Sequence, residues 1–235
     1  MKNIFLMFIM LAVTGGVPAQ DSVRQTTGEF TDSRDGMVYQ MVQIGEQVWM
    51  AQNLAYLPKV SQAKVQGGIW VYDFDSNSVT EAKTTDNYKI YGCLYDWKTA
   101  VAKNHGNGKD ICPVGWHLPS DQEWKMLESH LGMDPADVDK DATRISGKVG
   151  KQLKATRGWD DNGGGDNETG FSALPGGCRN TAGYFINLGR AAAFWTSDGA
   201  NADHAWNRIL LFNSTGVDRM IWSKLNGRSI RCIRD

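Results

Sequence analysis

Residues 111–123 read I-C-P-V-G-W-H-L-P-S-D-Q-E and combine a cysteine, two prolines and the start of a helix. Ser120 and Glu123 have the spacing of a capping box, in which each side chain hydrogen-bonds to a backbone N–H at the beginning of a helix. Asp121 places another negative charge at this positive end of the helix dipole. The segment therefore predicts a loop, tethered by a disulfide through Cys112, that leads into a helix.

The helix that follows is predicted to be amphipathic. Trp124, Leu127 and Leu131 recur at helical spacing, and Gly132 is suited to end the helix. No obvious catalytic pair occurs here, so we interpret the whole segment as structural.

The N-terminus has the features of a secretory signal. Lys2 supplies the positive charge, residues 4–13 form an apolar run too short to span a bilayer, and residues 17–19 offer a cleavage site. We therefore expect a signal peptide at residues 1–19, a flexible lead-in at 20–29 and one domain at 30–235. The mature protein is expected to be secreted or periplasmic, in solution or associated with the cell surface.

Composition excludes some partners. The formal net charge of −1 argues against nucleic acid and anionic membranes as partners, and no later segment is apolar enough to cross a membrane. Nine Trp, seven Tyr and 26 Gly indicate a loop-rich, aromatic-rich domain. Many secreted carbohydrate-binding proteins have this composition, as do many compact disulfide-bonded domains.

The chain has four cysteines, Cys93, Cys112, Cys178 and Cys232. An even number in an exported chain favours two disulfides, and the three possible connectivities stay open at this point. No C-x-x-C pair occurs, which argues against a zinc site or a thioredoxin-type motif.

Local patterns predict short strands with a few helices. Residues 30–54 form a strand meander with turns at Asp35-Gly36 and Gly45-Glu46. Further strands are expected at 194–197, 205–212 and 228–233, and a helix at about 96–103. Residues 73–86 are polar and are expected to form a surface loop. The fold class is therefore α+β.

Six segments together resemble the Fibrobacter succinogenes major paralogous domain, a family of secreted proteins in Bacteroidetes and Fibrobacteres. They occur in the expected order within residues 30–235. The segments are D-G-M-V-Y-Q-M-V-Q-I-G-E-Q-V-W-M-A-Q-N-L (35–54), Y-G-C-L-Y-D-W (91–97), I-C-P-V-G-W-H-L-P-S-D-Q-E-W (111–124), G-F-S-A-L-P-G-G-C-R (170–179), F-W-T-S (194–197) and G-R-S-I-R-C-I-R-D (227–235).

The resemblance implies a C-type-lectin-like fold, distantly similar to the formylglycine-generating (sulfatase-modifying) group. That fold has short twisted antiparallel strands, two main helices and long loops, and it is stabilised by disulfides. Its chain ends meet in one sheet, and a bridge ties the central helix region to the last strand. The resemblance therefore implies the pairs Cys112–Cys232 and Cys93–Cys178. It also implies surface binding or adhesion, and it supplies no catalytic residues.

One candidate site is an acidic, glycine-rich loop that resembles a calcium site in its chemistry. Carboxylate and amide oxygens on a flexible loop suit Ca²⁺, although the spacing fits no EF-hand. The alternative is a solvated glycine-rich turn. The candidate ligands are Asp160, Asp161, Asn162, Asp166, Asn167 and Glu168.

A second candidate is an aromatic and amide-rich surface formed mainly by the C-terminal third. Aromatic rings stack on sugar faces, and amides hydrogen-bond to hydroxyl groups; the same mixture suits protein recognition. The alternative is that most of these aromatic residues, Trp195 and Trp206 among them, belong to the core. The candidate ligand-binding residues are Trp70, Asn187, Asn201, Asn207 and Trp222.

These observations favour an exported, non-catalytic binding module that recognises a carbohydrate or a surface protein through its C-terminal loops. One alternative is an enzyme, either of the sulfatase-modifying type or a glycan hydrolase. The first enzyme type needs a reactive cysteine pair close in sequence, which the chain lacks, whereas a carboxylate pair for hydrolysis is a matter of spatial separation. Another alternative is a structural domain of the cell envelope.

Overall fold

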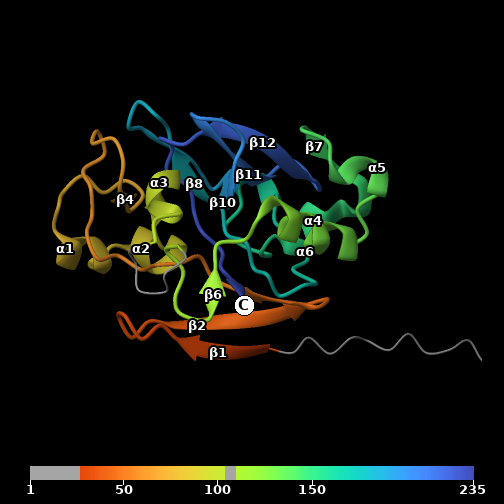
Figure 1. Ribbon diagram of the computed structural model, residues 1–235, viewed down its shortest axis with the longest axis horizontal. Helices are drawn as coiled ribbons and strands as arrows, with labels where there is room; N and C mark the ends of the chain where they lie inside the picture. Colours follow the sequence, from red (N-terminus) through yellow and green to blue (C-terminus); the bar gives the residue numbers. More distant parts are fainter. Residues whose placement is uncertain (1–26, 104–109) are drawn as a thin grey trace, which may run out of the picture.

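The computed structural model describes residues 27–103 and 110–235, so the predicted signal peptide and cleavage site lie outside the described residues. Within the described part the fold is mixed α+β, with mostly strands, few helices and one disulfide (Figure 1). The α+β prediction is confirmed. The first strand begins at Thr27, inside the segment predicted as a lead-in.

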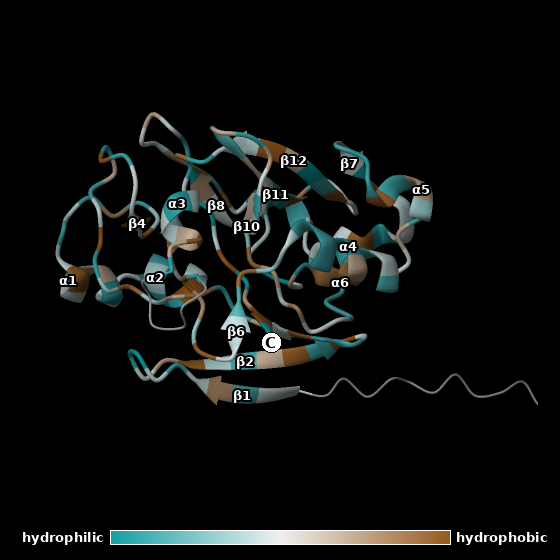
Figure 2. Ribbon diagram, viewed as in Figure 1, coloured by the Kyte–Doolittle hydropathy of each residue, from teal (hydrophilic) through white to brown (hydrophobic). Residues whose placement is uncertain are grey.

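Strand pairing brings the beginning and the end of the described chain into one sheet. The predicted meander is confirmed as β1 (Thr27–Thr31), β2 (Val38–Ile44) and β3 (Gln47–Met50). β13 (Ile233–Arg234) pairs with β3 and with β6 (Trp116–His117), so the strand order is β1-β2-β3-β13-β6. Hydrophobic and hydrophilic residues are interspersed along β2, and its buried residues, Tyr39, Val42 and Ile44, belong to two different core clusters (Figure 2).

A six-stranded sheet forms the other half of the molecule. Its order is β7 (Thr143–Arg144), β12 (Val217–Ser223), β11 (His204–Leu211), β10 (Ala191–Gly199), β8 (Gly176–Arg179) and β9 (Phe185–Leu188). β8 and β10 are parallel, and the other pairs are antiparallel. The strands predicted at 194–197 and 205–212 lie within β10 and β11.

The predicted strand at 228–233 is only partly formed. Arg228 and Ser229 make single bridges to Tyr95 and Phe194, and regular pairing begins at Ile233. The segment instead connects the two large sheets and the small sheet of β4 (Ile69–Trp70) and β5 (Leu94–Tyr95).

The central helix is confirmed as α4 (Asp121–His130), with both capping-box hydrogen bonds present between Ser120 and Glu123. It is the one helix of ten residues in the described chain, so the expectation of two main helices is wrong. The other helices are short: α1 (Val79–Thr84), α2 (Asp86–Tyr91), α3 (Trp97–Ala100), α5 (Pro135–Val138), α6 (Val149–Leu153) and the 3₁₀ turns η1 (Ser146–Lys148) and η2 (Asp160–Asn162).

The prediction of a surface loop at residues 73–86 is wrong in its second half. Ser78 caps α1 by accepting a hydrogen bond from the backbone N–H of Glu81, and Thr85 caps α2 in the same way from Tyr88. Two consecutive N-caps therefore fold a polar sequence into two helical turns, which bury Ala82 and Tyr88.

An aromatic cluster joins α4 to both large sheets. The rings of Trp49 on β3 and Trp124 on α4 lie 4.9 Å apart, and Phe194 on β10 lies 5.8 Å from Trp124. Phe171 packs edge-on against all three rings. The helical face predicted from Trp124 and Leu127 is thus buried in the core.

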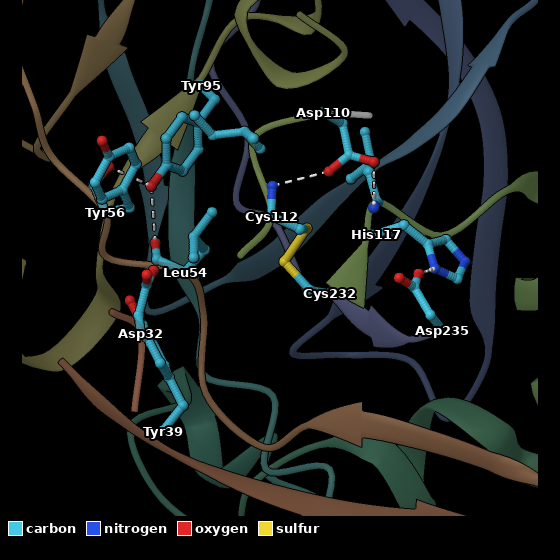
Figure 3. The surroundings of a disulfide bond; sticks show 12 residues. Asp32, Tyr39, Leu54, Tyr56, Tyr95, Asp110, Cys112, His117, Cys232 and Asp235 are labelled. Carbon is cyan, nitrogen blue, oxygen red and sulfur yellow. Dashed lines mark hydrogen bonds and ion pairs between the residues drawn. A yellow bond between two sulfur atoms is a disulfide. The ribbon is translucent and has the colours of Figure 1, made fainter. Parts of the chain in front are cut away.

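The disulfide ties the loop before α4 to the last strand, as Figure 3 shows. Cys112 and Cys232 are bonded and fully buried, which confirms this pair. Asp110 holds the loop in place, because its carboxylate accepts hydrogen bonds from the backbone N–H groups of Cys112 (2.8 Å) and Leu118 (3.0 Å). The bridge closes a loop across 120 positions of sequence.

The expected pair Cys93–Cys178 is not formed, because both residues are free thiols in the structure. Cys93 precedes β5 and packs in the core beside Tyr95, whereas Cys178 lies in β8 close to Arg228. Burial raises the pKa of both thiols. The correction follows from topology: each cysteine is buried in a different environment, and pairing by elimination ignored this.

A network of buried charges fills the interface between α4 and the six-stranded sheet. Glu128 is fully buried and accepts hydrogen bonds from Arg144 and Arg208, at 2.7–2.8 Å for the shortest contacts. Asp121 binds Arg208 at 2.8 Å and Arg219 at 2.8 Å. Burial alone would raise the pKa of Asp121, but the two arginines outweigh it and lower that pKa overall.

We predict that Glu128→Gln lowers the free energy of unfolding by about 3–5 kcal/mol, because two buried guanidinium groups then lose their shared carboxylate. Urea denaturation measures the effect. Gln122→Ala, at an exposed position of the same helix, is the control and should change stability by less than about 0.5 kcal/mol. Equal stability of Glu128→Gln and the control would contradict a role for the network.

Candidate functional site

Four loops meet at one end of the six-stranded sheet, and we call them the loop cluster: residues 61–68, 180–184, 199–203 and 224–227. Two cationic side chains connect them. Arg179 contacts the first, second and fourth loops, and Lys224 joins the third to the fourth. The arrangement brings together segments that are far apart in the sequence.

Arg179 is a buried anchor for three of these loops. Its guanidinium donates to the carbonyl oxygens of Ala63 (2.8 Å), Val65 (2.9 Å), Asn180 (3.2 Å) and Leu225 (3.4 Å). The loops therefore have fixed positions relative to the sheet.

The ring of Trp70 packs against the Arg179 guanidinium. It lies 4.1 Å from the Arg179 guanidinium carbon and is fully buried. The prediction that Trp70 contacts a ligand at the surface is wrong, because β4 turns the indole into the core.

Lys224 fixes the hairpin between β10 and β11. Its ammonium group donates to the carbonyl oxygens of Asn201 (2.7 Å) and Ala202 (3.1 Å) and lies 4.3 Å from the centre of the Trp97 ring. Asn201 is exposed, and its side-chain oxygen accepts from the backbone N–H groups of Asp203 and His204. Asn201 thus lies in the loop cluster and stabilises its own turn.

Apolar and aromatic side chains are exposed on and beside the loop cluster. Tyr184 is 60% exposed, and the Lys64 ammonium group lies 3.4 Å from the centre of its ring. Trp222, near the end of β12, is 43% exposed. Val65 and Leu225 are also exposed, and their carbonyl groups are the ones that Arg179 binds. This surface combines flat aromatic rings with a rigid backbone.

The remaining ligand-binding candidates divide between the surface and the interior. Asn187 is exposed on edge strand β9, toward the end away from Tyr184. Asn207 is fully buried on β11, where its amide nitrogen donates to Met220 O, so the prediction of an exposed contact at Asn207 is wrong. Strand alternation turned its side chain inward, next to its cross-strand neighbour Trp195.

The alternative interpretation of the aromatic residues placed Trp195 and Trp206 in the core. Trp195 is fully buried, whereas Trp206 is half-buried and packs under the guanidinium of Arg219 at 3.6 Å.

The acidic loop proposed for calcium is organised by ion pairs and backbone packing. Asp166 pairs with Lys151 at 3.2 Å, and the Asn167 amide donates to the hydroxyl of Ser172 at 2.9 Å. Asp160 lies 3.9 Å from Arg190. Asp161, Asn162 and Glu168 are exposed, and no group of three or more His, Cys, Asp or Glu residues is arranged around a common point in the described chain.

The cation at the base of this loop is the ammonium group of Lys154. It donates to the carbonyl oxygens of Gly163 (2.6 Å), Leu211 (3.0 Å) and Ser214 (2.9 Å), and burial lowers its pKa. Only glycine fits at position 163, because a Cβ there would lie 2.1 Å from the backbone oxygen of Phe212. The glycines therefore permit close backbone packing around a buried lysine.

We predict that Lys154→Met destabilises the protein by about 3 kcal/mol or more, because three buried carbonyl oxygens lose a charged donor. Thermal unfolding measures the loss. Lys151→Met, which removes a half-exposed lysine from α6 three residues before Lys154, is the matched control and should cost about 1 kcal/mol at most. If both substitutions lowered the melting temperature equally, the ammonium group would not be the organising element.

His117 bridges α4 and β13 through two carboxylates. One ring nitrogen lies 2.7 Å from Glu123. The other lies 2.7 Å from Asp235, as Figure 3 shows. The hydrogen bond with Glu123 raises the pKa of His117; burial opposes this, and Asp235 adds to it. Burial would raise the pKa of Glu123, but His117 and Ser120 lower it to about 2. Both ring nitrogens are occupied, so the group serves as a structural bridge, as the sequence suggested.

We predict that the stability added by His117 depends on pH. A histidine whose pKa is raised on folding stabilises most below its unfolded value of 6.5, and the contribution disappears as the pH rises through the folded value. The wild type should therefore exceed His117→Gln in stability by more at about pH 5.5 than at about pH 9. Urea denaturation at both values tests this, and exposed His130→Gln provides the control. A difference that does not change with pH would refute the bridge.

A groove of about 720 Å³ lies between β2, α2 and the segment 155–174. Its lining includes Arg231, which is buried and already donates to Asn53, Met50 O, Phe171 O and Ser172 O. The groove is also lined by Lys89 and Arg157. We choose the loop cluster as the candidate binding surface because exposed aromatic rings and anchored loops lie together there.

The fold and the loop cluster define a disulfide-bonded α+β domain with a rigid loop surface. In the described residues no helix is both long enough and apolar enough to cross a membrane. The family model of the Fibrobacter succinogenes major domain matches residues 42–234, and the chain belongs to this family, as the resemblance predicted. No curated protein and no solved structure matches the chain.

Proposed function

We propose that this protein is an exported, non-catalytic binding module that recognises an extracellular glycan through the loop cluster. The observation that carries the proposal is the pairing of exposed aromatic rings with a fixed framework. Tyr184 and Trp222 are exposed, while Arg179 and Lys224 fix the loops around them through backbone carbonyl groups. A preorganised aromatic surface loses little conformational entropy on binding, which favours recognition of flat sugar faces.

A C-type-lectin-like arrangement is part of this proposal. β13 pairs with β3, so the two ends of the domain share a sheet, and the disulfide ties the entrance of α4 to Cys232. Both features are those that the family resemblance implies for such a fold. Three of the four loops in the loop cluster follow the central helix, and the loop cluster then forms the recognition surface.

Export and the absence of catalysis are the other parts of the proposal. A disulfide is typical of an oxidising compartment, which agrees with the signal peptide expected at residues 1–19. Cys93 and Cys178 are buried and their pKa values are raised, whereas thiol-dependent oxidation requires an accessible thiolate. This supports a binding role over sulfatase-modifying chemistry.

We expect the mature chain to bind at least one member of a panel of immobilised polysaccharides, and Trp222→Ala and Tyr184→Ala to weaken that binding by roughly 10-fold each. Ile90→Ala removes an equally exposed apolar side chain on α2 and should leave binding unchanged. Repeating the experiment with calcium and with a chelator tests whether the 160–168 loop needs a metal.

Retention of affinity by both aromatic variants would refute the loop cluster as the binding surface. No binding across the panel would refute glycan recognition, and a surface protein would then be the partner to seek.

A further inference from the structure

Arg228 differs from the other buried arginines in its partners. Arg144 and Arg208 are paired with carboxylates, and Arg179 binds backbone carbonyl oxygens. Arg228 is only 2% exposed, and its Nε is buried without a hydrogen-bond acceptor among the described residues. No carboxylate in the described chain is paired with it.

Two tryptophans enclose this guanidinium. Its central carbon lies 5.3 Å from the centre of the Trp195 ring and 5.2 Å from that of Trp222. Trp195 is fully buried on β10, and Trp222 is 43% exposed near the end of β12. The guanidinium is therefore held by rings on two strands, and one of those rings reaches solvent.

A buried cation without a counterion raises the free energy of the folded protein. The ionisable group that acts on Arg228 most directly is the thiol of Cys178. Burial raises the pKa of that thiol, so it carries no negative charge near neutral pH. An anion from outside the described chain would supply the counterion that Arg228 lacks. Trp222 marks the side from which a ligand reaches the guanidinium, because β7 pairs only with Val217 and Asp218 and does not continue along β12.

We propose that Arg228 and Trp222 form a subsite for a sugar that carries a carboxylate, that is, a uronic acid residue of an acidic glycan. The planar guanidinium binds the carboxylate, and the exposed part of Trp222 stacks on the sugar ring. This inference rests on the proposed function and specifies its ligand class.

The test compares oligogalacturonate with the matched neutral oligogalactose by isothermal titration calorimetry, with quenching of tryptophan fluorescence as a second readout. The wild type should bind the acidic sugar at least ~10-fold more tightly. Arg228→Gln should remove this preference, and Arg228→Lys should restore only part of it, because lysine lacks the planar fork. Arg190→Gln, at an exposed arginine in the turn between β9 and β10, should leave the preference unchanged.

Stability provides a readout that separates a ligand-binding role from a structural one. If Arg228 has no counterion in the folded protein, Arg228→Met should unfold at the same temperature as the wild type or higher, while losing the acidic preference. A large drop in melting temperature would assign Arg228 to the framework and overturn the proposal. For the intact wild type, the Nε–H resonance of Arg228 should shift on addition of galacturonate, and a resonance that does not move would also overturn it.

The outcomes distinguish this inference from the function on which it rests. Equal affinity for the acidic and neutral sugars, with both lost in Trp222→Ala, would overturn the acidic subsite and keep the glycan-binding surface. A preference for sulfated over carboxylated oligosaccharides that depends on Arg228 would overturn the carboxylate assignment. Absence of binding to every sugar would overturn both proposals.

Discussion

The buried ion-pair network between α4 and the six-stranded sheet is the constraint on which the arrangement of this molecule depends. Glu128 and Asp121 on the helix each bind two arginines from the strands, so the helix has one position at which all charges are paired. Apolar packing tolerates small shifts of a helix, whereas charged pairs that are buried do not, because any shift leaves a charge uncompensated. The aromatic cluster around Trp124 then fills the space that the network defines.

Cationic side chains also replace regular secondary structure as the means of fixing loops. Arg179, Lys154 and Lys224 each donate to two or more backbone carbonyl oxygens from segments distant in sequence. A loop-rich chain has many carbonyl groups outside strands and helices, and these groups need donors when they are buried. One long flexible cation satisfies several of them at once. This explains how a protein with short helices and strands maintains a defined surface.

The sequence identified the features that depend on neighbouring residues and missed those that depend on topology. The capping box at Ser120 and the meander turns are local, and the family motifs implied the pair Cys112–Cys232. Trp70 and Asn207 were assigned to the surface because composition alone does not give the direction of a side chain. Ser78 and Glu81 have the same capping-box spacing as Ser120 and Glu123, so the same pattern could have predicted α1. The Arg179 anchor could not be predicted in this way, since three of its four carbonyl partners lie 46 to 116 positions away.

Rigidity and recognition are linked at the loop cluster through these anchors. β12 presents Trp222 at the surface, β10 holds Trp195 in the core, and the Arg228 guanidinium lies against both rings. A cation enclosed by aromatic rings keeps its position without a carboxylate, so its hydrogen-bonding capacity is not consumed by the protein. The neighbouring anchors use theirs fully on carbonyl oxygens. The fold thus separates the arginines that build the framework from Arg228, whose Nε has no acceptor among the described residues.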